Sequence, residues 1–304
     1  MLRVNFRNKR SRKQFIFYSL MIALPVLQVV IFYFGVNINS ILLAFKNYDR
    51  DTGDYVWTGF EHFTKMIKEM TTDVTWAFAF RNSVKVWLVS SVVSMALALF
   101  FSYYIYKRGV LKNFFRVMLF LPSIVSSIVM VILFRNLVDN FIPALVLRLG
   151  GEEMLGLLAD HNTTMLVLIV YGIVMGFGTN VLLLSGAMSS ISTSITEAAQ
   201  IDGANRWCEF WRIVFPQIFP TFLTIFIISI ANLFSNQLNL FSFYGSNAEA
   251  QFSTVGYILY KRTLSASYAE YSDLAAIGIL LTLIIVPITL GIRKILEKVG
   301  PSND

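Results

Sequence analysis

The sequence is poor in charge, cysteine and histidine, and each shortage argues against a class of protein. Charged residues make up 14% of the 304 residues, whereas about a quarter is typical of a soluble domain. The single cysteine, Cys208, excludes a disulfide framework and any cysteine metal site, and we expect no bound metal. The two histidines, His62 and His161, stand far apart in the sequence, and neither HExxH nor GxSxG occurs. An enzyme is therefore not favoured.

Two energy sources for transport are also poorly supported within this chain. No GxxxxGK[ST] motif is present, so ATP and Mg would have to bind to a separate polypeptide. Ion-coupled transporters carry ionisable relays inside the membrane. In this sequence Lys85, Arg135 and Asp273 fall only near the ends of the apolar stretches. An ion-coupled secondary transporter is kept as the less favoured alternative.

Long hydrophobic runs are what the chain does have, since 56% of its residues are hydrophobic. A helix needs roughly 20 apolar residues to cross a bilayer. The stretches that reach this length are 15–36, 84–105, 115–135, 164–185, 217–240 and 273–292. They predict an all-α, polytopic membrane protein with six transmembrane helices. The expected organisation is a basic N-terminal segment 1–14, a membrane domain 15–292 and a tail 293–304.

The net charge of +7 is distributed by topology. Basic residues gather in 1–14, in 106–116 and just after residue 292, whereas 37–82, 135–163 and 241–273 each carry a small net negative charge. Basic residues next to membrane spans mark the cytoplasmic side. We therefore expect both termini and the loop 186–216 to be cytoplasmic. This pattern does not favour binding to nucleic acid.

The loop 186–216 is predicted to form a short helix, a turn and a second helix. Good helix formers begin at Thr196-Glu197, where the helix dipole favours an acid, and Asp202-Gly203 is a typical turn that would end the helix. Asn205 is positioned to cap the next helix, which is rich in aromatic residues. The residues alone leave two interpretations open. The loop is either a surface that docks into a partner's groove or an amphipathic helix lying at the lipid headgroups.

The same loop carries a pattern that resembles a known family. The matching residues are Glu197, Ala198, Ala199, Asp202, Gly203, Ala204, Phe210, Ile213, Pro216 and Pro220. This pattern resembles the cytoplasmic EAA loop of permease subunits in binding-protein-dependent ABC importers. Weaker similarity to maltose-type carbohydrate permeases lies in Phe80-Arg81-Asn82-Ser83, in Leu121-Pro122 and in 254–260. The chain departs from the family by having Ser192 and Ser194 where Pro and Glu are usual.

The resemblance implies a type I importer permease fold in a bacterial inner or plasma membrane. It implies a carbohydrate substrate, an oligosaccharide in the first instance, delivered by an extracytoplasmic solute-binding protein. It further implies a second homologous permease subunit and a dimer of ATPase subunits. In the family the loop docks into the ATPase, so Glu197 would make polar contacts to it. Gly203 would allow the tight turn, and Ala198, Ala199 and Ala204 would permit close packing. A non-sugar solute is the alternative substrate.

A candidate substrate path lies at the end of the fifth apolar stretch. Asn232, Ser235, Asn236 and Asn239 are spaced so that a helix would place them on one face, and Phe243 and Tyr244 follow closely. Amide groups beside aromatic rings would suit the hydroxyl groups and C–H faces of a sugar. Hydrogen bonds between helices are an equally open interpretation. The stretch 244–247 lacks the Gly-Gly-Pro sequence that many sugar permeases carry there.

The segment 37–82 is predicted to lie outside the membrane. It is mixed in charge and contains several aromatic residues. It could contact the binding protein or form a solvated loop with a partly folded helix, and the sequence does not separate these two interpretations.

Overall fold

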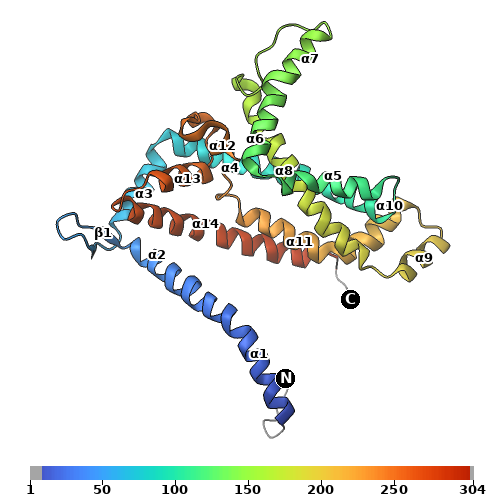
Figure 1. The fold of residues 1–304 in the computed structure, drawn as a ribbon, viewed down its shortest axis with the longest axis horizontal. Helices are drawn as coiled ribbons and strands as arrows, with labels where there is room; N and C mark the ends of the chain where they lie inside the picture. The colour runs from blue at the N-terminus through green and yellow to red at the C-terminus, as the bar shows by residue number, and fades with distance from the viewer. Residues whose placement is uncertain (1–8, 302–304) are drawn as a thin grey trace. The chain divides into compact units, whose positions relative to one another are not determined.

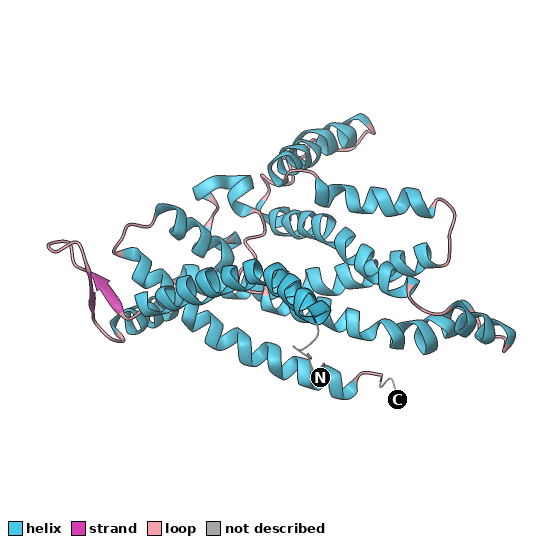
Figure 2. Ribbon diagram, turned by 60° about the horizontal axis from the view of Figure 1, so that its bottom comes forward, coloured by secondary structure: helices cyan, strands magenta, loops and turns pink. Residues whose placement is uncertain are grey.

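The computed structural model describes residues 9–301, in which nearly all secondary structure is helical (Figures 1 and 2). Most of the basic segment 1–14 and the last residues of the tail 293–304 lie outside the described residues. The chain forms two compact units. One contains residues up to Lys68 together with Ala266–Leu280, and the other contains Glu69–Ser265 and the residues from Leu281 onward.

Within the described residues, six helical segments are long and apolar enough to cross a membrane, which confirms the predicted number. Their bounds are Lys13–Leu43, Val74–Tyr106, Ser127–Arg148, His161–Ser189, Arg206–Ala231 and Glu270–Val299. Most extend beyond the predicted stretches, because polar residues at the ends of an apolar run continue the same helix.

The first unit begins with one continuous helical segment. It comprises α1 (Lys9–Gln28), the π-helical η1 (Val29–Val36) and α2 (Asn37–Leu43). A small antiparallel hairpin follows, in which β1 (Lys46–Tyr48) pairs with β2 (Tyr55–Trp57), and Tyr48 lies opposite Tyr55 (Figure 2). The helix α3 (Glu61–Thr72) begins in this unit. The segment 37–82 is therefore largely ordered into secondary structure.

A polar cluster joins α3 to the start of α14 (Glu270–Val299) in the first unit. His62 is buried, and its Nδ1 atom lies 2.6 Å from Oδ1 of Asp273. The Nζ atom of Lys65 lies 2.5 Å from the other carboxylate oxygen of Asp273. The sequence did not indicate this pairing, because the three residues fall in segments about 200 positions apart.

The second unit is organised around α4 (Val74–Tyr106), α8 (His161–Ser189) and α11 (Phe215–Ala231), which contact one another (Figure 1). Side chains fix where two of these helices begin. The carboxylate of Asp73 accepts a hydrogen bond from the backbone N–H of Thr75, and that of Asp160 accepts one from Asn162. Each satisfies a donor that the first helical turn leaves unpaired.

A salt bridge also links the last turn of α3 to α13 (Val255–Ser265) within the second unit. The guanidinium of Arg262 pairs with the carboxylate of Glu69, which also accepts a hydrogen bond from Trp76 Nε1 at 3.1 Å. Burial opposes ionisation of this carboxyl, but the hydrogen bonds from Arg262 and Trp76 outweigh it. They hold the pKa of Glu69 below its ordinary value.

The predicted third span, 115–135, is wrong in its placement. The chain forms α5 (Lys112–Ile124), breaks at Val125 and Ser126 in extended backbone, and resumes as α6 (Ser127–Asn136). The helix then continues through the π-helical η2 (Leu137–Phe141) and α7 (Ile142–Arg148), which occupy much of the predicted loop 135–163. Hydropathy is continuous across the break, so the apolar pattern could not reveal it.

The predicted fifth span, 217–240, extends too far. A continuous helix runs through α10 (Arg206–Glu209), the π-helical η3 (Phe210–Val214) and α11, but it ends at Ala231. The side chain of Asn236 accepts a hydrogen bond from the backbone N–H of Leu238, and Leu238 and Asn239 have left-handed backbone angles. Short amide side chains compete with the helix for backbone donors, which explains the early end.

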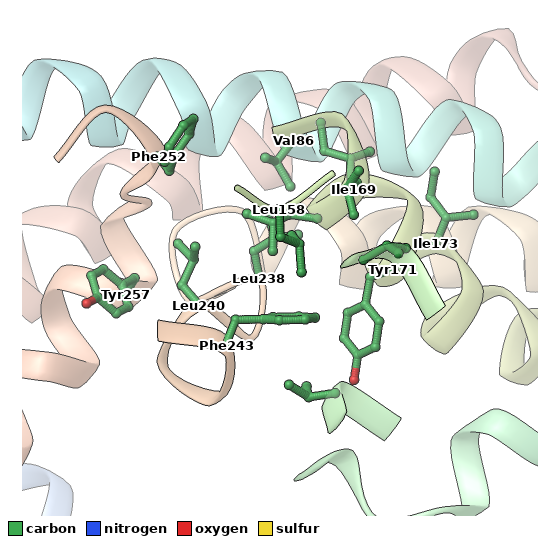
Figure 3. Packing of buried hydrophobic residues seen from close by; sticks show 14 residues of the cluster. Val86, Leu158, Ile169, Tyr171, Ile173, Leu238, Leu240, Phe243, Phe252 and Tyr257 are labelled. Atoms are coloured by element: carbon green, nitrogen blue, oxygen red, sulfur yellow. The ribbon is translucent and has the colours of Figure 1, made fainter. Parts of the chain in front are cut away.

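The residues after this helix end build a compact buried cluster (Figure 3). It contains Leu238, Leu240 and Phe243, and the ring of Phe243 meets that of Tyr171 from α8 edge to face at 5.0 Å. The short helices that carry this region are α12 (Leu240–Tyr244), η4 (Gly245–Asn247) and η5 (Ala250–Phe252). The predicted loop 241–273 is therefore folded over most of its length.

Candidate coupling loop and membrane cavity

The loop 186–216, called the EAA-like loop below, folds as the sequence predicted. Its first helix is α9 (Thr193–Ile201). Gly203 follows in the left-handed region with φ of +81°, its N–H donates to the carbonyl of Gln200, and the N–H of Ala204 donates to that of Ala199. This pair of bonds defines a Schellman motif, in which glycine avoids the cost of a left-handed side chain. The helix starts before the predicted Thr196, so Glu197 lies in its middle.

The second helix of the loop is capped as predicted. The side-chain oxygen of Asn205 accepts a hydrogen bond of 2.8 Å from the backbone N–H of Cys208, the third residue of α10. The aromatic residues that follow separate into two environments. Trp207 and Trp211 are exposed, whereas Phe210 is buried against Tyr103 of α4. Phe210 therefore anchors the loop to α4, and the two exposed tryptophans border an apolar pocket that α4 also lines.

The predicted loop residues divide in the same way. Glu197, Ala198, Asp202 and Gly203 are exposed, Ala199 is buried, and Ala204, Ile213 and Pro216 are half-buried. Two isoleucines were missed by the sequence analysis. Ile201 is 86% exposed and Ile195 is 44% exposed. With Ala198 between them, they form an apolar outer face on α9, because residues three apart share a side of a helix.

An ion pair that no sequence motif indicates joins this loop to the end of α4. The carboxylate of Glu209 is 2% exposed and pairs with the ammonium of Lys107, which is 22% exposed and lies just past the end of α4. The hydroxyl of Tyr103 also donates to the backbone carbonyl of Arg206 at 2.9 Å. In the sequence, Lys107 is only one of the basic residues of 106–116 that indicate the cytoplasmic side. A lone acid among the aromatic residues 207–211 was the one available hint.

A cavity of about 180 Å³ lies among α4, α8, α11 and the residues after Ala231. Polar side chains on its wall are those of Ser83, Trp87, Ser90, Ser91, Ser94, Asn180, Ser229, Asn232, Asn236 and Thr254. The serines on α4 were missed because they lie within an apolar span. None of the cavity's described lining residues is ionisable. The site therefore offers hydroxyl, amide and indole groups but no charge.

Hydrogen bonds hold part of this lining in place. Trp87 Nε1 donates to Ser229 Oγ at 3.2 Å, and Asn180 Nδ2 donates to Ser94 Oγ at 3.3 Å. The hydroxyl of Ser90 is buried and has no partner among the described residues. A buried hydroxyl without a partner is costly, so the cavity has a polar group available to a bound molecule or water. Its volume is large enough for several waters.

The structure separates the residues of the predicted substrate path. Asn232 and Asn236 line the cavity, and the hydroxyl of Ser235 donates to Oδ1 of Asn232 at 3.5 Å, but α11 ends at Ala231 and Asn239 does not continue their helical face. Ser235 is exposed. Asn239 has a left-handed backbone with φ of 53°.

The two aromatic residues of that prediction also lie elsewhere. Phe243 is buried in the cluster of Figure 3. The hydroxyl of Tyr244 donates to the carbonyl of Leu158 at 3.1 Å, and burial raises the pKa of this tyrosine. Neither residue lines the cavity.

The chain is similar to a known family of transport proteins and to individual permeases. Residues 90–299 match the family described as "Binding-protein-dependent transport system inner membrane component". A galactooligosaccharides transport system permease protein of Bacillus subtilis is 29% identical over 269 residues, covering 83% of this chain and 63% of that protein. A multiple sugar-binding transport system permease protein of Streptococcus mutans is 23% identical over 261 residues, covering 86% of this chain and 88% of that protein.

A solved structure shares the fold. A chain of a bacterial ABC transporter involved in the import of the acidic polysaccharide alginate aligns with a TM-score of 0.75 at 17% sequence identity. The alignment covers 94% of this chain and 97% of that one.

Proposed function

This chain belongs to the family of binding-protein-dependent transport system inner membrane components, and from that premise we propose that it is a permease subunit of an ATP-driven carbohydrate importer. In this proposal it pairs with a second, homologous permease and with two ATPase subunits that bind ATP and Mg. The observation that carries the proposal is the EAA-like loop, whose apolar outer face is exposed while its inner face is fastened to a membrane helix.

The loop has the features that docking into an ATPase requires. Ile195, Ala198 and Ile201 present an apolar face suited to a groove in a partner. Glu197 is exposed beside that face and forms no ion pair among the described residues, so its carboxylate is available for polar contacts. The Schellman motif at Gly203 fixes the angle between the two helices of the loop.

The attachment of the loop to α4 supports a mechanical role. The Lys107–Glu209 ion pair and the Tyr103 hydrogen bond join the loop to a helix that also lines the membrane cavity. Closure of the ATPase subunits on ATP would move the loop, and α4 would follow. The path would then pass from inward-open to outward-open, receive substrate from the binding protein, and reset after hydrolysis.

The neutral lining of the cavity supports an uncharged carbohydrate, and the similarity to a galactooligosaccharides transport system permease favours an oligosaccharide. Serine hydroxyls and the amides of Asn180, Asn232 and Asn236 can donate to and accept from sugar hydroxyls, and the Trp87 side chain offers a flat face. No described residue on the cavity wall carries a charge that would compensate a carboxylated sugar, and a buried charge without a partner is costly. A small neutral non-sugar solute is the alternative that the same lining would accommodate.

The charge pattern supports an orientation with both termini and the EAA-like loop in the cytoplasm. The hairpin β1–β2 and α3 would then face the extracytoplasmic binding protein. Together these assignments describe a multi-pass protein of a bacterial inner or plasma membrane.

Co-purification of the tagged chain from its native membrane tests the assembly. We expect an ATPase and a second six-span permease to be recovered with it. Ile201→Glu should lower ATPase recovery, because it places a charge on the apolar face, whereas Val299→Glu, a similarly exposed residue near the end of α14, should not. Equal ATPase recovery with both variants would contradict docking through α9.

Uptake of labelled oligosaccharides tests the substrate. Neutral oligosaccharides should be transported and should not be displaced by an excess of acidic ones. Asn232→Ala should reduce uptake at unchanged ATPase recovery, whereas Asn247→Ala, an exposed residue outside the cavity, should have little effect. Stronger uptake of an acidic sugar would contradict the assignment of the cavity.

A further inference from the structure

A second, larger cavity lies outside the membrane path, between the turn that joins α4 to α5 and the start of α9. Its volume is about 610 Å³. The charged residues on its wall are Lys107, Arg108, Lys112, Arg116 and Glu197. We call it the basic pocket. The proposed transport cycle uses Lys107 through its ion pair with Glu209, but it does not use Arg108, Lys112 or Arg116.

The basic pocket keeps an excess of positive charge. Lys107 is committed to the buried carboxylate of Glu209. Arg108, Lys112 and Arg116 form no ion pair with any carboxylate among the described residues, and Glu197 is the one acid on the described wall. Three cations facing one carboxylate leave a net positive site, which favours an anionic ligand.

The turn that carries these cations is held in an unusual conformation. Arg108 and Leu111 have left-handed backbone angles, with φ of 55° and 60°. The ring of Tyr104 covers Gly109 so closely that a Cβ atom there would lie 2.5 Å from it. The Tyr104 hydroxyl also donates to the carbonyl of Val110 at 2.7 Å. Strained residues persist only where their surroundings enforce them, so this turn is built to present its side chains in a fixed way.

Exposed apolar side chains also lie on the turn and on α5, on a different side of the helix from Lys112 and Arg116. Val110 and Leu111 at the turn are 78% and 65% exposed, and Phe114 and Val117 on the helix are 52% and 59% exposed. The cations lie just past the end of the candidate span Val74–Tyr106, and the exposed apolar side chains nearby are suited to contact with lipid.

We propose that the basic pocket binds the phosphate headgroup of an anionic phospholipid. The inference uses the orientation proposed above, which places the pocket at the cytoplasmic leaflet, where anionic lipids attract basic segments. Because Glu197 lies on the pocket wall and on the coupling helix, lipid occupancy changes the charge around the residue expected to contact the ATPase.

Binding is tested on the purified full-length chain, without the ATPase, so that its outcome does not depend on the coupling role. Native mass spectrometry would compare retention of phosphatidylglycerol and of phosphatidylcholine with the same acyl chains. The test variant combines Arg108→Gln, Lys112→Gln and Arg116→Gln. The control variant removes the same charge on the same expected side through Arg212→Gln, Lys294→Gln and Lys298→Gln.

We expect the wild type and the control variant to retain phosphatidylglycerol in preference to phosphatidylcholine. The test variant should bind it about a hundredfold more weakly, since each of the three basic residues contributes about fivefold at an anionic surface. Soluble glycerol phosphate should not compete.

Three results would overturn the proposal. Unchanged retention of phosphatidylglycerol by the test variant would show that Arg108, Lys112 and Arg116 do not bind the lipid. Competition by glycerol phosphate at similar concentration would make it a site for free phosphate. Unchanged lipid retention together with loss of ATPase recovery from membranes would make it a protein-docking surface.

Discussion

The ion pair between Lys107 and Glu209 predicts an asymmetric response to mutation. Lys107→Met would leave the Glu209 carboxylate, which is 2% exposed, buried without a partner. No other described group donates a hydrogen bond to its Oε1 atom. Removal of one partner from a buried pair costs about 3–5 kcal/mol. We expect Lys107→Met to destabilise the protein by this amount, which lowers the unfolding temperature by on the order of 10 °C.

The reciprocal change should cost less. Glu209→Gln keeps the shape of the side chain and leaves the Lys107 ammonium, which is 22% exposed and can turn toward water. Loss of a charged hydrogen-bond partner of this kind costs about 1–3 kcal/mol. The double variant should be less destabilised than the sum of the single variants, by at least about 1 kcal/mol, because the two residues contact each other.

Thermal unfolding of the purified chain in one detergent measures all three variants. The surface pair of Arg293 and Glu297 on α14 is a matched control, since its side chains are 57% and 47% exposed. Arg293→Met should cost no more than about 1 kcal/mol. Two results would refute the buried pair. One is a double variant whose loss of stability equals the sum of the losses in Lys107→Met and Glu209→Gln. The other is a loss in Lys107→Met as small as that in Arg293→Met.

Three further predictions concern the left-handed turn at Gly203, the contact between α8 and α5 at Gly178, and the pH dependence of stability. Gly203→Val should strain the left-handed turn by about 1–2 kcal/mol and reduce ATPase recovery, whereas Gly203→Asn should be tolerated; equal recovery of the two would show that the turn does not need its φ of +81°. Gly178→Ala should destabilise by about 1–3 kcal/mol in thermal unfolding, because its Cβ would lie 1.9 Å from the carbonyl oxygen of Leu119 on α5, whereas Gly186→Ala on the same helix meets nothing and should be neutral. Because the pKa of Glu69 is held below its ordinary value of 4.5, its contribution to stability is present above pH 4.5 and is lost as pH falls through the lowered pKa. Unfolding temperatures measured from about pH 6 to about pH 3 should therefore fall more steeply in the wild type than in Arg262→Gln, and parallel curves would contradict this.

Local signals in the sequence were enough for some features. The number of spans follows from the length of the apolar runs, because an apolar helix of about 20 residues has no stable alternative to the membrane. The helix–turn–helix form of the EAA-like loop follows from Gly203, which accepts a left-handed backbone, and from Asn205, whose short amide caps the next helix. Each of these depends on residues that are neighbours in the chain.

Other features depend on residues that are distant in the chain. Hydropathy sums side chains without regard to backbone hydrogen bonds, so it could place neither the break after Ile124 nor the end of α11 at Ala231. Because α11 ends at Ala231, Asn239 does not share the expected helical face with Asn232 and Asn236.

Tertiary structure alone decided how the functional surfaces are assembled. The cavity exists because α4 turns its serines toward Asn180 and Ser229 of two other helices. Glu209 is buried opposite Lys107, which lies about 100 positions earlier in the chain. A polar side chain in an apolar span has the same sequence signature whether it faces lipid, a neighbouring helix or a cavity. Only the packing of the helices against one another determines which of these it meets.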